Sequence, residues 1–245
     1  MRHRYGDLPQ QFGDLYLPRR GTPRGTVVVI HGGFWQSMYS LSLGAATSAD
    51  LADRGWAAWN IEYRRIGDGG GWPATFVDVA AAVDHLAQLE EVDAGRTITL
   101  GHSAGGHLAA WVASRRDASM PGGATRVQVD AVVAQAGVLD LATAVRTGLG
   151  GTAVNGLVGG TPTRLPGRYA QVDPSERLPL GVPVRCVHGT DDTTVPISQS
   201  RGYVDAARAA GDDATLVEVP GDHFALIDPS TPAWRRTLTV LDALG

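Results

Sequence analysis

The sequence of 245 residues contains a single cysteine, Cys186, which excludes an internal disulfide framework and suits a reducing compartment. It also contains no basic stripe. Because 21 Lys and Arg residues stand against 25 Asp and Glu residues, for a net charge of −4, we expect no nucleic-acid partner. No group of His, Cys and carboxylate residues has the spacing of metal ligands, and we expect neither a metal ion nor another cofactor.

Long apolar segments are missing as well. The N-terminal residues 1–7 lack the apolar core of a signal peptide, and no uninterrupted run approaches the roughly 20 residues that span a bilayer. The glycine-rich segment 67–72 lacks the final glycine of G-x-G-x-x-G and the lysine of a P-loop, so it predicts no nucleotide site. We therefore expect a cytoplasmic protein without membrane contact, folded as one domain over residues 1–245.

Apolar, β-branched runs alternate along the chain with alanine-rich helical patterns. This alternation predicts an α/β fold, with a mostly parallel central sheet flanked by helices on both faces. The expected strands are 12–17 (an edge strand), 26–30, 55–63, 97–101, 127–136, 184–188 and 214–219. The expected helices are 73–89, 104–114, 198–210 and 234–244.

The pattern fails between residues 141 and 180, where glycines and prolines interrupt short apolar pieces. A long irregular segment inside an α/β domain is either a mobile lid or a compact excursion over the active site. We expect residues 141–180 to be a small lid or cap insertion.

The most informative motif is Gly101-His102-Ser103-Ala104-Gly105. The pentapeptide alone is weak evidence, but here it lies between a predicted strand and a predicted helix. That layout is typical of a nucleophile elbow, in which a strained turn lifts the serine hydroxyl above the sheet. The flanking glycines are needed where side chains would collide with the neighbouring backbone.

Three further loops follow predicted strands: His31-Gly32-Gly33-Phe34-Trp35, the loop His188 to Asp192, and Gly221-Asp222-His223-Phe224. Because the carboxyl ends of parallel strands meet at one edge of a sheet, these loops are expected to converge on Ser103. A serine hydroxyl needs an imidazole to remove its proton, and the imidazole needs a carboxylate to fix its tautomer. The chain supplies all three residue types.

On these motifs the chain resembles the α/β-hydrolase family, from Val27 to its end. The resemblance implies Ser103 as nucleophile, His223 as base and Asp192 as acid, the acid being placed by His188-Gly189-x-x-Asp192-x-x-Val195-Pro196. The H-G-G-x-W loop also looks like the oxyanion loop of kynurenine formamidases and related small esterases.

The acid has alternatives. Asp191 adjoins Asp192 and is otherwise a capping or solvent-facing residue, while Asp140 follows the preceding strand and is otherwise a helix N-cap. Asp222 neighbours His223, but adjacent side chains in an extended segment point apart.

The oxyanion of the tetrahedral intermediate needs backbone N–H donors, for which we expect Gly33, Phe34 and Ala104. Trp35, Tyr39 and Trp72 are candidates for an aromatic pocket wall, with burial in the core as the alternative. His31 and His188 are expected to hold their loops through hydrogen bonds. His102 and His107 are expected either to pack or to support the residues of the site, without a chemical role of their own.

Together these features predict a serine hydrolase that cleaves a small-molecule carboxylic ester or activated amide through an acyl-enzyme. The narrower alternative is an arylformamidase acting on N-formylkynurenine, which the resemblance of the His31–Trp35 loop suggests. An alternative of another class is a non-catalytic receptor that uses the hydrolase pocket. The sequence gives no indication of the oligomeric state.

Overall fold

A computed structural model describes residues 1–92, 95–116 and 118–244. Its centre is an eight-stranded sheet in the order β1-β2-β4-β3-β5-β6-β7-β8. The strands are β1 (Arg2–Arg4), β2 (Phe12–Tyr16), β3 (Thr26–Ile30), β4 (Ala57–Ile61), β5 (Thr97–His102), β6 (Ala131–Gln135), β7 (Val184–Gly189) and β8 (Ala214–Val219). The pairs from β4 through β8 are parallel, whereas β1 and β2 pair antiparallel, so the mostly parallel sheet is confirmed.

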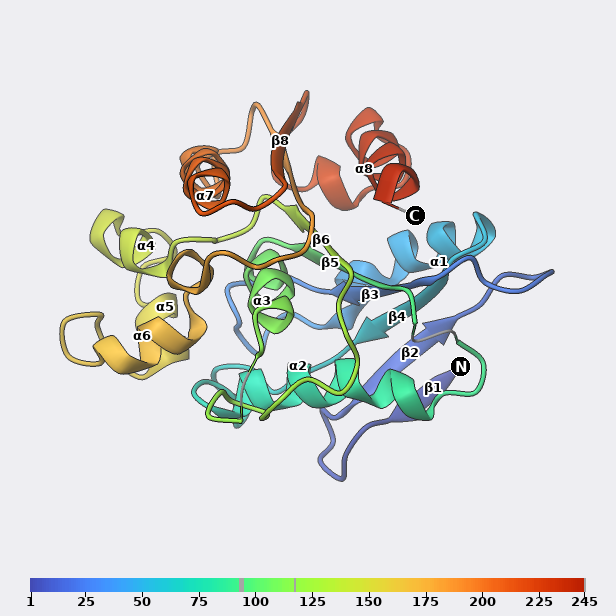
Figure 1. Ribbon diagram of the computed structural model, residues 1–245, viewed down its shortest axis with the longest axis horizontal. Helices are drawn as coiled ribbons and strands as arrows, with labels where there is room; N and C mark the ends of the chain where they lie inside the picture. Colours follow the sequence, from blue (N-terminus) through green and yellow to red (C-terminus); the bar gives the residue numbers. More distant parts are fainter. Residues whose placement is uncertain (93–94, 117, 245) are drawn as a thin grey trace.

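Helices cover both faces of the sheet, as expected (Figure 1). They are α1 (Ala45–Asp53), α2 (Ala74–Asp84), α3 (Ala104–Ala113), α4 (Leu141–Thr147), α5 (Ala153–Val158), α6 (Pro166–Val172), α7 (Ser198–Ala209) and α8 (Pro232–Leu244). Short 3-10 helices are η1 (Leu41–Gly44), η2 (His85–Gln88), η3 (Pro174–Arg177) and η4 (Ala225–Ile227). In Figure 1, α1 and α8 lie on one side of the sheet, and α2, α3 and α7 lie on the other.

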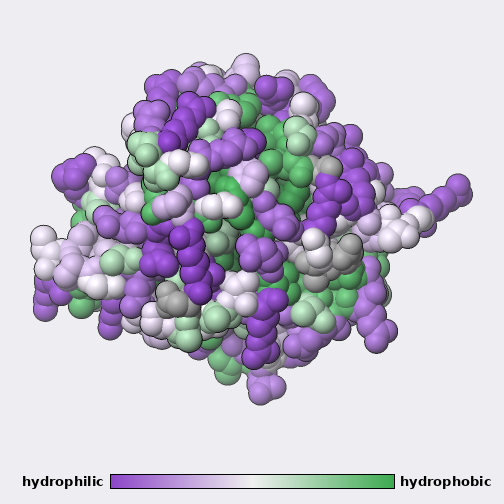
Figure 2. Space-filling view, in the orientation of Figure 1, coloured by the Kyte–Doolittle hydropathy of each residue, from purple (hydrophilic) through white to green (hydrophobic). Residues whose placement is uncertain are grey.

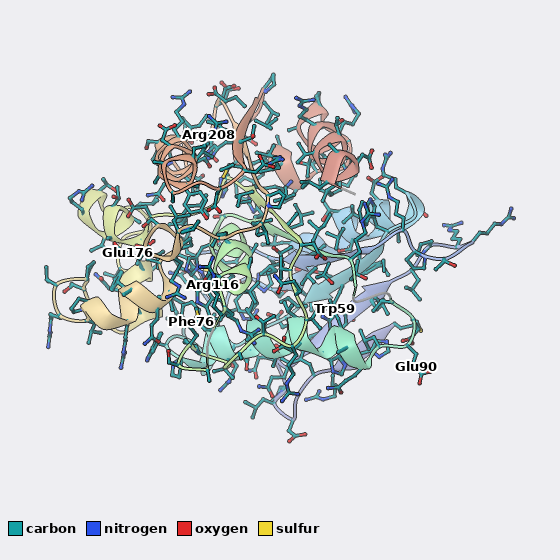
Figure 3. The ribbon with its side chains drawn as sticks, in the orientation of Figure 1. Trp59, Phe76, Glu90, Arg116, Glu176 and Arg208 are labelled. Carbon is teal, nitrogen blue, oxygen red and sulfur yellow. The ribbon has the colours of Figure 1, made fainter. Side chains whose placement is uncertain are left out.

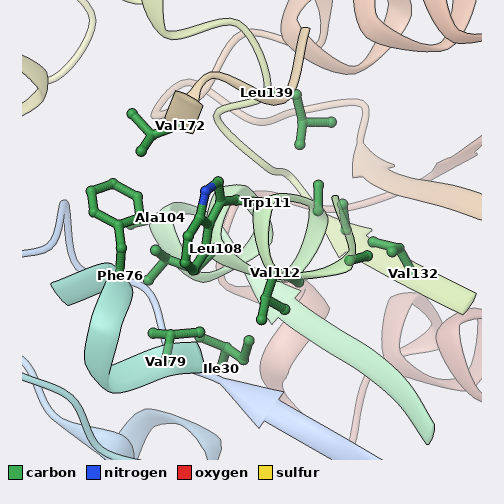
Figure 4. Close-up of a cluster of buried hydrophobic side chains, with 14 of the residues drawn as sticks. Ile30, Phe76, Val79, Ala104, Leu108, Trp111, Val112, Val132, Leu139 and Val172 are labelled. Carbon is green, nitrogen blue, oxygen red and sulfur yellow. The ribbon is translucent and has the colours of Figure 1, made fainter. Parts of the chain in front are cut away.

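Helix α3 is buried along its whole length, and this burial fixes the position of the residue that precedes it. Figure 4 shows its side chains packed between those of α2 and the sheet. Trp111 of α3 meets Phe76 of α2 edge to face, with ring centroids 4.8 Å apart, and Leu108 packs in the same cluster. A helix of small and apolar residues can approach the sheet closely, so the strand-to-helix turn at Ser103 is held on both sides.

Two expectations about the N-terminal half are corrected by the structure. The strand near residue 12 is not at the edge, because β2 pairs with both β1 and β4. The edge strand β1 has three residues, two of them exposed arginines, and therefore carries no apolar pattern. Helix α1 was also not anticipated, because it lacks a side-chain N-cap and alternates small and polar residues.

The segment 141–180 is not irregular, since it contains α4, α5, α6 and η3. Gly148 and Gly159 end α4 and α5 in the left-handed conformation, and Pro166 begins α6. The glycines and prolines that looked like loop signals are therefore the boundaries of short helices. The N–H of Trp72 donates to the carbonyl of Leu157 in α5, over 2.7 Å, which ties this segment to the loop after β4.

Polar side chains cover most of the face seen in Figure 2, with apolar surface visible only between them. In Figure 3, Glu90 and Arg208 lie at the periphery of the molecule, while Phe76 lies within it. Among the described helices, none combines the length and the apolar character that crossing a membrane requires.

Candidate active site

Ser103 occupies the turn between β5 and α3 with φ 57° and ψ −119°, a backbone conformation that side-chain-bearing residues rarely adopt. Its N–H donates to the carbonyl of Gln135 at the end of β6, over 2.8 Å. The residue is 3% exposed. The strained strand-turn-helix layout is the one that the Gly101–Gly105 motif predicts.

The glycines of this turn have no space for a side chain. A Cβ atom at Gly101 would lie 2.0 Å from the carbonyl oxygen of Gly105, and one at Gly105 would lie 2.0 Å from that of Ile30. Real Cβ atoms do not approach a backbone oxygen so closely. Glycine is thus required here by the close approach of strands and helix, and not by a positive φ.

Asp192 and His223 meet across the loops that follow β7 and β8. Oδ2 of Asp192 accepts a hydrogen bond from Nδ1 of His223 over 2.6 Å, and both side chains are almost completely buried. Oδ1 of Asp192 accepts from the N–H groups of Thr194 and Val195. Burial raises the pKa of the Asp192 carboxyl, but hydrogen bonds from His188, His223 and the Val195 N–H outweigh it, so the net pKa is well below its usual range.

The other three carboxylates that the sequence analysis considered as the acid have different hydrogen-bond partners. Asp140 caps α4 by accepting from the N–H of Thr143, over 2.7 Å, which is its alternative role. Asp191 is exposed and accepts from the N–H of Gly221. Asp222 accepts from the N–H groups of Phe224 and Ala225 and turns away into the start of η4.

His223 lies beside the serine turn. The centroid of its ring is 4.4 Å from that of His102, the residue immediately before Ser103. Asp192, His223 and Ser103 therefore come from three separate loops at one edge of the sheet, as the order of the strands requires.

The loop after β3 lies against the serine turn. A Cβ at Gly32 would be 2.7 Å from the carbonyl oxygen of His102 and 3.0 Å from Cβ of Ser103. Gly33, Phe34 and Trp35 all have positive φ, at 104°, 48° and 57°. Such consecutive left-handed residues turn the backbone sharply beside Ser103, where Ala104 begins α3.

A buried network holds this loop. The hydrogen bonds of His31 are as the sequence predicts, whereas its partner Glu62 was not predicted. Nε2 of His31 lies 3.0 Å from Oε1 of Glu62, and Nδ1 of His31 lies 2.8 Å from the carbonyl oxygen of Gly32. The Arg65 guanidinium lies 3.2 Å from Oε1 of Glu62. The Tyr63 ring stacks on the His31 ring, and the Tyr63 hydroxyl donates to the backbone carbonyl of His31. Only the position of Glu62, directly after a buried strand, could have indicated its role.

The aromatic residues divide between core and surface. The prediction that Trp35 lines the pocket is wrong. Its indole is fully buried and meets the His107 ring edge to face, with ring centroids 5.2 Å apart, so it presents no surface to a ligand. Tyr39 is 37% exposed and packs over Gly33. Trp72 is half-buried, and the Arg168 guanidinium lies over its ring at 5.3 Å.

Phe34 reaches across to the 141–180 segment, where it lies close to Gly150. His188 holds its own loop, with Nε2 2.9 Å from the carbonyl oxygen of Val195 and Nδ1 2.8 Å from Oγ of Ser200. Within residues 1–92, 95–116 and 118–244, no cluster of three or more His, Cys, Asp or Glu side chains is placed to hold a metal ion.

Comparison with known proteins agrees with this architecture. Over 99% of the chain, the fold matches a truncated carbohydrate esterase from gut microbiota, with a TM-score of 0.86, 24% identity and 94% of that chain covered. It also matches the thermophilic esterase Est2 of Thermogutta terrifontis, with a TM-score of 0.79, 26% identity, and 99% and 90% of the two chains covered. The protein has the α/β-hydrolase fold.

Sequence relatives are esterases of longer chain. Esterase LipC of Mycobacterium tuberculosis is 28% identical over 91% of this chain and 59% of its own length. A probable isoprenylcysteine alpha-carbonyl methylesterase, ICME, of Oryza sativa subsp. japonica is 28% identical over 89% and 56%. The chain thus spans less than two thirds of these relatives. The family model BD-FAE matches residues 13–206, most of the sequence, and the chain belongs to the BD-FAE family.

Proposed function

We propose that the protein is a serine hydrolase that cleaves small carboxylic esters, with Ser103, His223 and Asp192 as its catalytic residues. The observation that carries the proposal is the buried 2.6 Å hydrogen bond between Asp192 and His223, beside a serine in a strained turn. The esterase names of the sequence relatives support the choice of reaction.

Each residue has a defined chemical task in this proposal. Because Asp192 accepts the proton on Nδ1 of His223, Nε2 of that ring carries a lone pair. Nε2 removes the Ser103 proton as Oγ attacks the ester carbonyl carbon. The tetrahedral oxyanion is stabilised by the N–H groups of Gly33, Phe34 and Ala104.

The intermediate then collapses. The bond to the leaving alkoxide breaks as His223 returns its proton to that oxygen, and the acyl group remains on Ser103 as an ester. A water molecule, deprotonated by His223, attacks this ester in the same way, which releases the carboxylic acid and restores Ser103. No step requires a cofactor.

The substrate pocket is proposed to lie between the loop after β3 and the 141–180 segment, which acts as its cap. The contact of Phe34 with Gly150 and the hydrogen bond from Trp72 to Leu157 support this placement. Tyr39 and Trp72 retain exposed surface for an acyl or leaving group, whereas Trp35 does not. Because Trp35 is buried, the tryptophan of the His31–Trp35 loop does not favour one substrate class over another by direct contact.

The test compares kcat/KM for p-nitrophenyl acetate, p-nitrophenyl butyrate and N-formylkynurenine, with Ser103→Ala as control. We expect both nitrophenyl esters to turn over, the formamide to be at least 100-fold slower, and the variant to be inactive. Preference for the formamide would replace the esterase proposal by the arylformamidase. Covalent labelling of Ser103 by a fluorophosphonate separates an enzyme from a receptor, because a folded protein that resists labelling is not a serine hydrolase.

A further inference from the structure

His102, which immediately precedes Ser103, makes a contact that links two of the loops described above. Its side chain is buried, and Nε2 lies 2.9 Å from the backbone carbonyl oxygen of His223. A carbonyl oxygen only accepts hydrogen bonds, so Nε2 carries the proton and donates it. The serine turn thereby holds the main chain of the residue that would deprotonate Ser103.

The other face of His102 meets the loop after β3. Nδ1 is buried and has no hydrogen-bond partner among the described residues, and a Cβ at Gly32 would lie 3.2 Å from it. A cavity of about 10 Å³, lined among others by Gly32, His102 and Gln135, lies here. His102 thus touches the serine turn, the proposed oxyanion loop and the histidine loop at once.

Burial first, and then the neighbouring His223, lower the pKa of His102 to about 3, against the hydrogen bond to the His223 carbonyl and the charge of Asp192. The His102 ring is therefore neutral at the near-neutral pH of an esterase assay. Neutrality matters because His223 becomes an imidazolium during the reaction, and its ring centroid is only 4.4 Å away. A cationic neighbour would oppose that charge.

We propose that His102 is a positioning residue for His223, holding the histidine loop against the serine turn through the bond from its Nε2–H to the His223 carbonyl. This inference rests on the proposed function, in which His223 is the base. Asp192 fixes the His223 ring at Nδ1, and His102 fixes its main chain, so two bonds from different loops determine where Nε2 points. An error of about 1 Å in such a position costs up to about 100-fold in rate.

His107 provides a matched control within the same helix region. It is also buried, its Nε2 lies 2.9 Å from a backbone carbonyl oxygen, that of Val172, and its Nδ1 has no partner in the described part of the chain. Burial lowers its pKa to about 4. The two histidines differ in the main chain that they hold: His107 bonds the last residue of α6, whereas His102 bonds the residue proposed as the base.

The test uses a pair of side chains of nearly equal shape. His102→Gln keeps an N–H donor for the carbonyl, whereas His102→Met does not, and the same two substitutions are made at His107. We expect His102→Met to lower kcat on p-nitrophenyl acetate about 10-fold or more relative to His102→Gln, with KM changed less than about threefold. The pair at His107 should differ by less than about twofold in kcat.

Equal kcat values for His102→Met and His102→Gln would overturn the proposal. The proposal would also be overturned if the kcat ratio of the Gln variant to the Met variant were the same at His102 and at His107. If His102→Met does not fold, His102→Asn, whose shorter side chain holds its amide farther from the carbonyl, takes its place.

A proton NMR measurement tests the positioning role of His102 without relying on ester hydrolysis. The proton between Nδ1 of His223 and Asp192 should give a downfield proton NMR signal in the wild type, in His102→Gln and in His107→Met, and a broadened or lost signal in His102→Met. If the wild type neither hydrolyses esters nor reacts with a fluorophosphonate, the proposed function fails, and this signal still decides whether His102 holds His223. An unchanged signal in His102→Met contradicts the positioning role.

Discussion

Nδ1 of His223 lies 2.6 Å from Oδ2 of Asp192, with both side chains closed off from solvent. The two residues are 31 positions apart and come from the loops after neighbouring strands. His188 approaches the same carboxylate oxygen, at 3.4 Å. The carboxylate is therefore held in its ionised form by several donors, and it determines which nitrogen of His223 carries the proton.

We expect Asp192→Asn to lower kcat about 10³- to 10⁴-fold, because an amide cannot hold the His223 tautomer that leaves Nε2 unprotonated. Steady-state hydrolysis of p-nitrophenyl acetate measures the loss. Asp191→Asn is the adjacent control and should stay within about twofold of the wild type, since Asp191 is exposed and its carboxylate accepts from the N–H of Gly221 rather than from His223. If Asp191→Asn loses more activity than Asp192→Asn, then Asp191 and not Asp192 is the acid of the site.

A methyl group at Gly105 should destabilise the fold, because it would lie 2.0 Å from the carbonyl oxygen of Ile30. The expected loss for Gly105→Ala is about 3 kcal/mol in the free energy of unfolding, at the upper end for overpacking. Gly202→Ala is the control: Gly202 lies within α7, and its Cβ would meet nothing within 4 Å. Urea unfolding should show Gly202→Ala as stable as the wild type or more stable by about 1 kcal/mol. Equal stability of both variants would contradict the close approach at Gly105.

The elements with strong apolar patterns could be predicted from the sequence. The strand 26–30 was placed to the residue because five consecutive apolar or β-branched side chains are buried on both faces. The helix after Ser103 was placed within one residue of its end. Weak patterns failed: β1 is too short to show a period, and α4 to α6 have only six or seven residues each, so their glycines and prolines dominate the composition.

The candidate site was predictable only where a residue stands in a motif. Ser103, Asp192 and His223 follow strands whose carboxyl ends must meet. The resemblance to the α/β-hydrolase family implied that Asp192, and not Asp191 or Asp140, faces the histidine. The supporting contacts were not predictable, because they join residues distant in sequence without a pattern of their own. Glu62 beneath His31, and His102 against the His223 carbonyl, needed the three-dimensional structure.

Replacement of Glu62 by Gln should weaken both the fold and the reaction. The Glu62 carboxylate is buried and faces His31, Arg65 and the N–H of Leu41. Burial raises its pKa, but His31 first, and then the N–H groups of Tyr63 and Leu41, lower it overall. Removing the charge leaves Arg65 without its buried partner, which costs about 3 kcal/mol in the free energy of unfolding. We expect kcat to fall as well, because His31 begins the proposed oxyanion loop.

The control for this prediction is Glu218→Gln. Glu218 pairs with Arg201 at the surface, where an ion pair contributes less than about 1 kcal/mol. Chemical unfolding and kcat on p-nitrophenyl acetate are measured for both variants. If Glu62→Gln resembles Glu218→Gln in both quantities, the buried network does not support the loop.

Asp173 should make the stability of the protein depend on pH in a defined window. It is buried between α6 and η3, and its carboxylate accepts from the N–H groups of Ala142 and Ser175. Burial raises its pKa from 3.8 to about 6 despite these bonds. Between pH 4 and pH 6 the Asp173 carboxyl is protonated in the folded protein but ionised in the unfolded chain. The contribution of protonated Asp173 to the free energy of unfolding is therefore fully present below about pH 4 and is lost as the pH rises through about 6.

The loss amounts to up to about 3 kcal/mol, at about 1.4 kcal/mol for each pKa unit. Asp173→Asn keeps an acceptor for the Ala142 N–H but cannot titrate. The difference in unfolding free energy between wild type and Asp173→Asn should therefore fall from pH 4 to pH 7 and be constant above pH 7, as measured by urea unfolding at each pH. Glu176→Gln, at an exposed carboxylate three residues along, should leave the dependence unchanged. A difference that does not vary with pH would mean that Asp173 is ionised in the folded protein throughout this range.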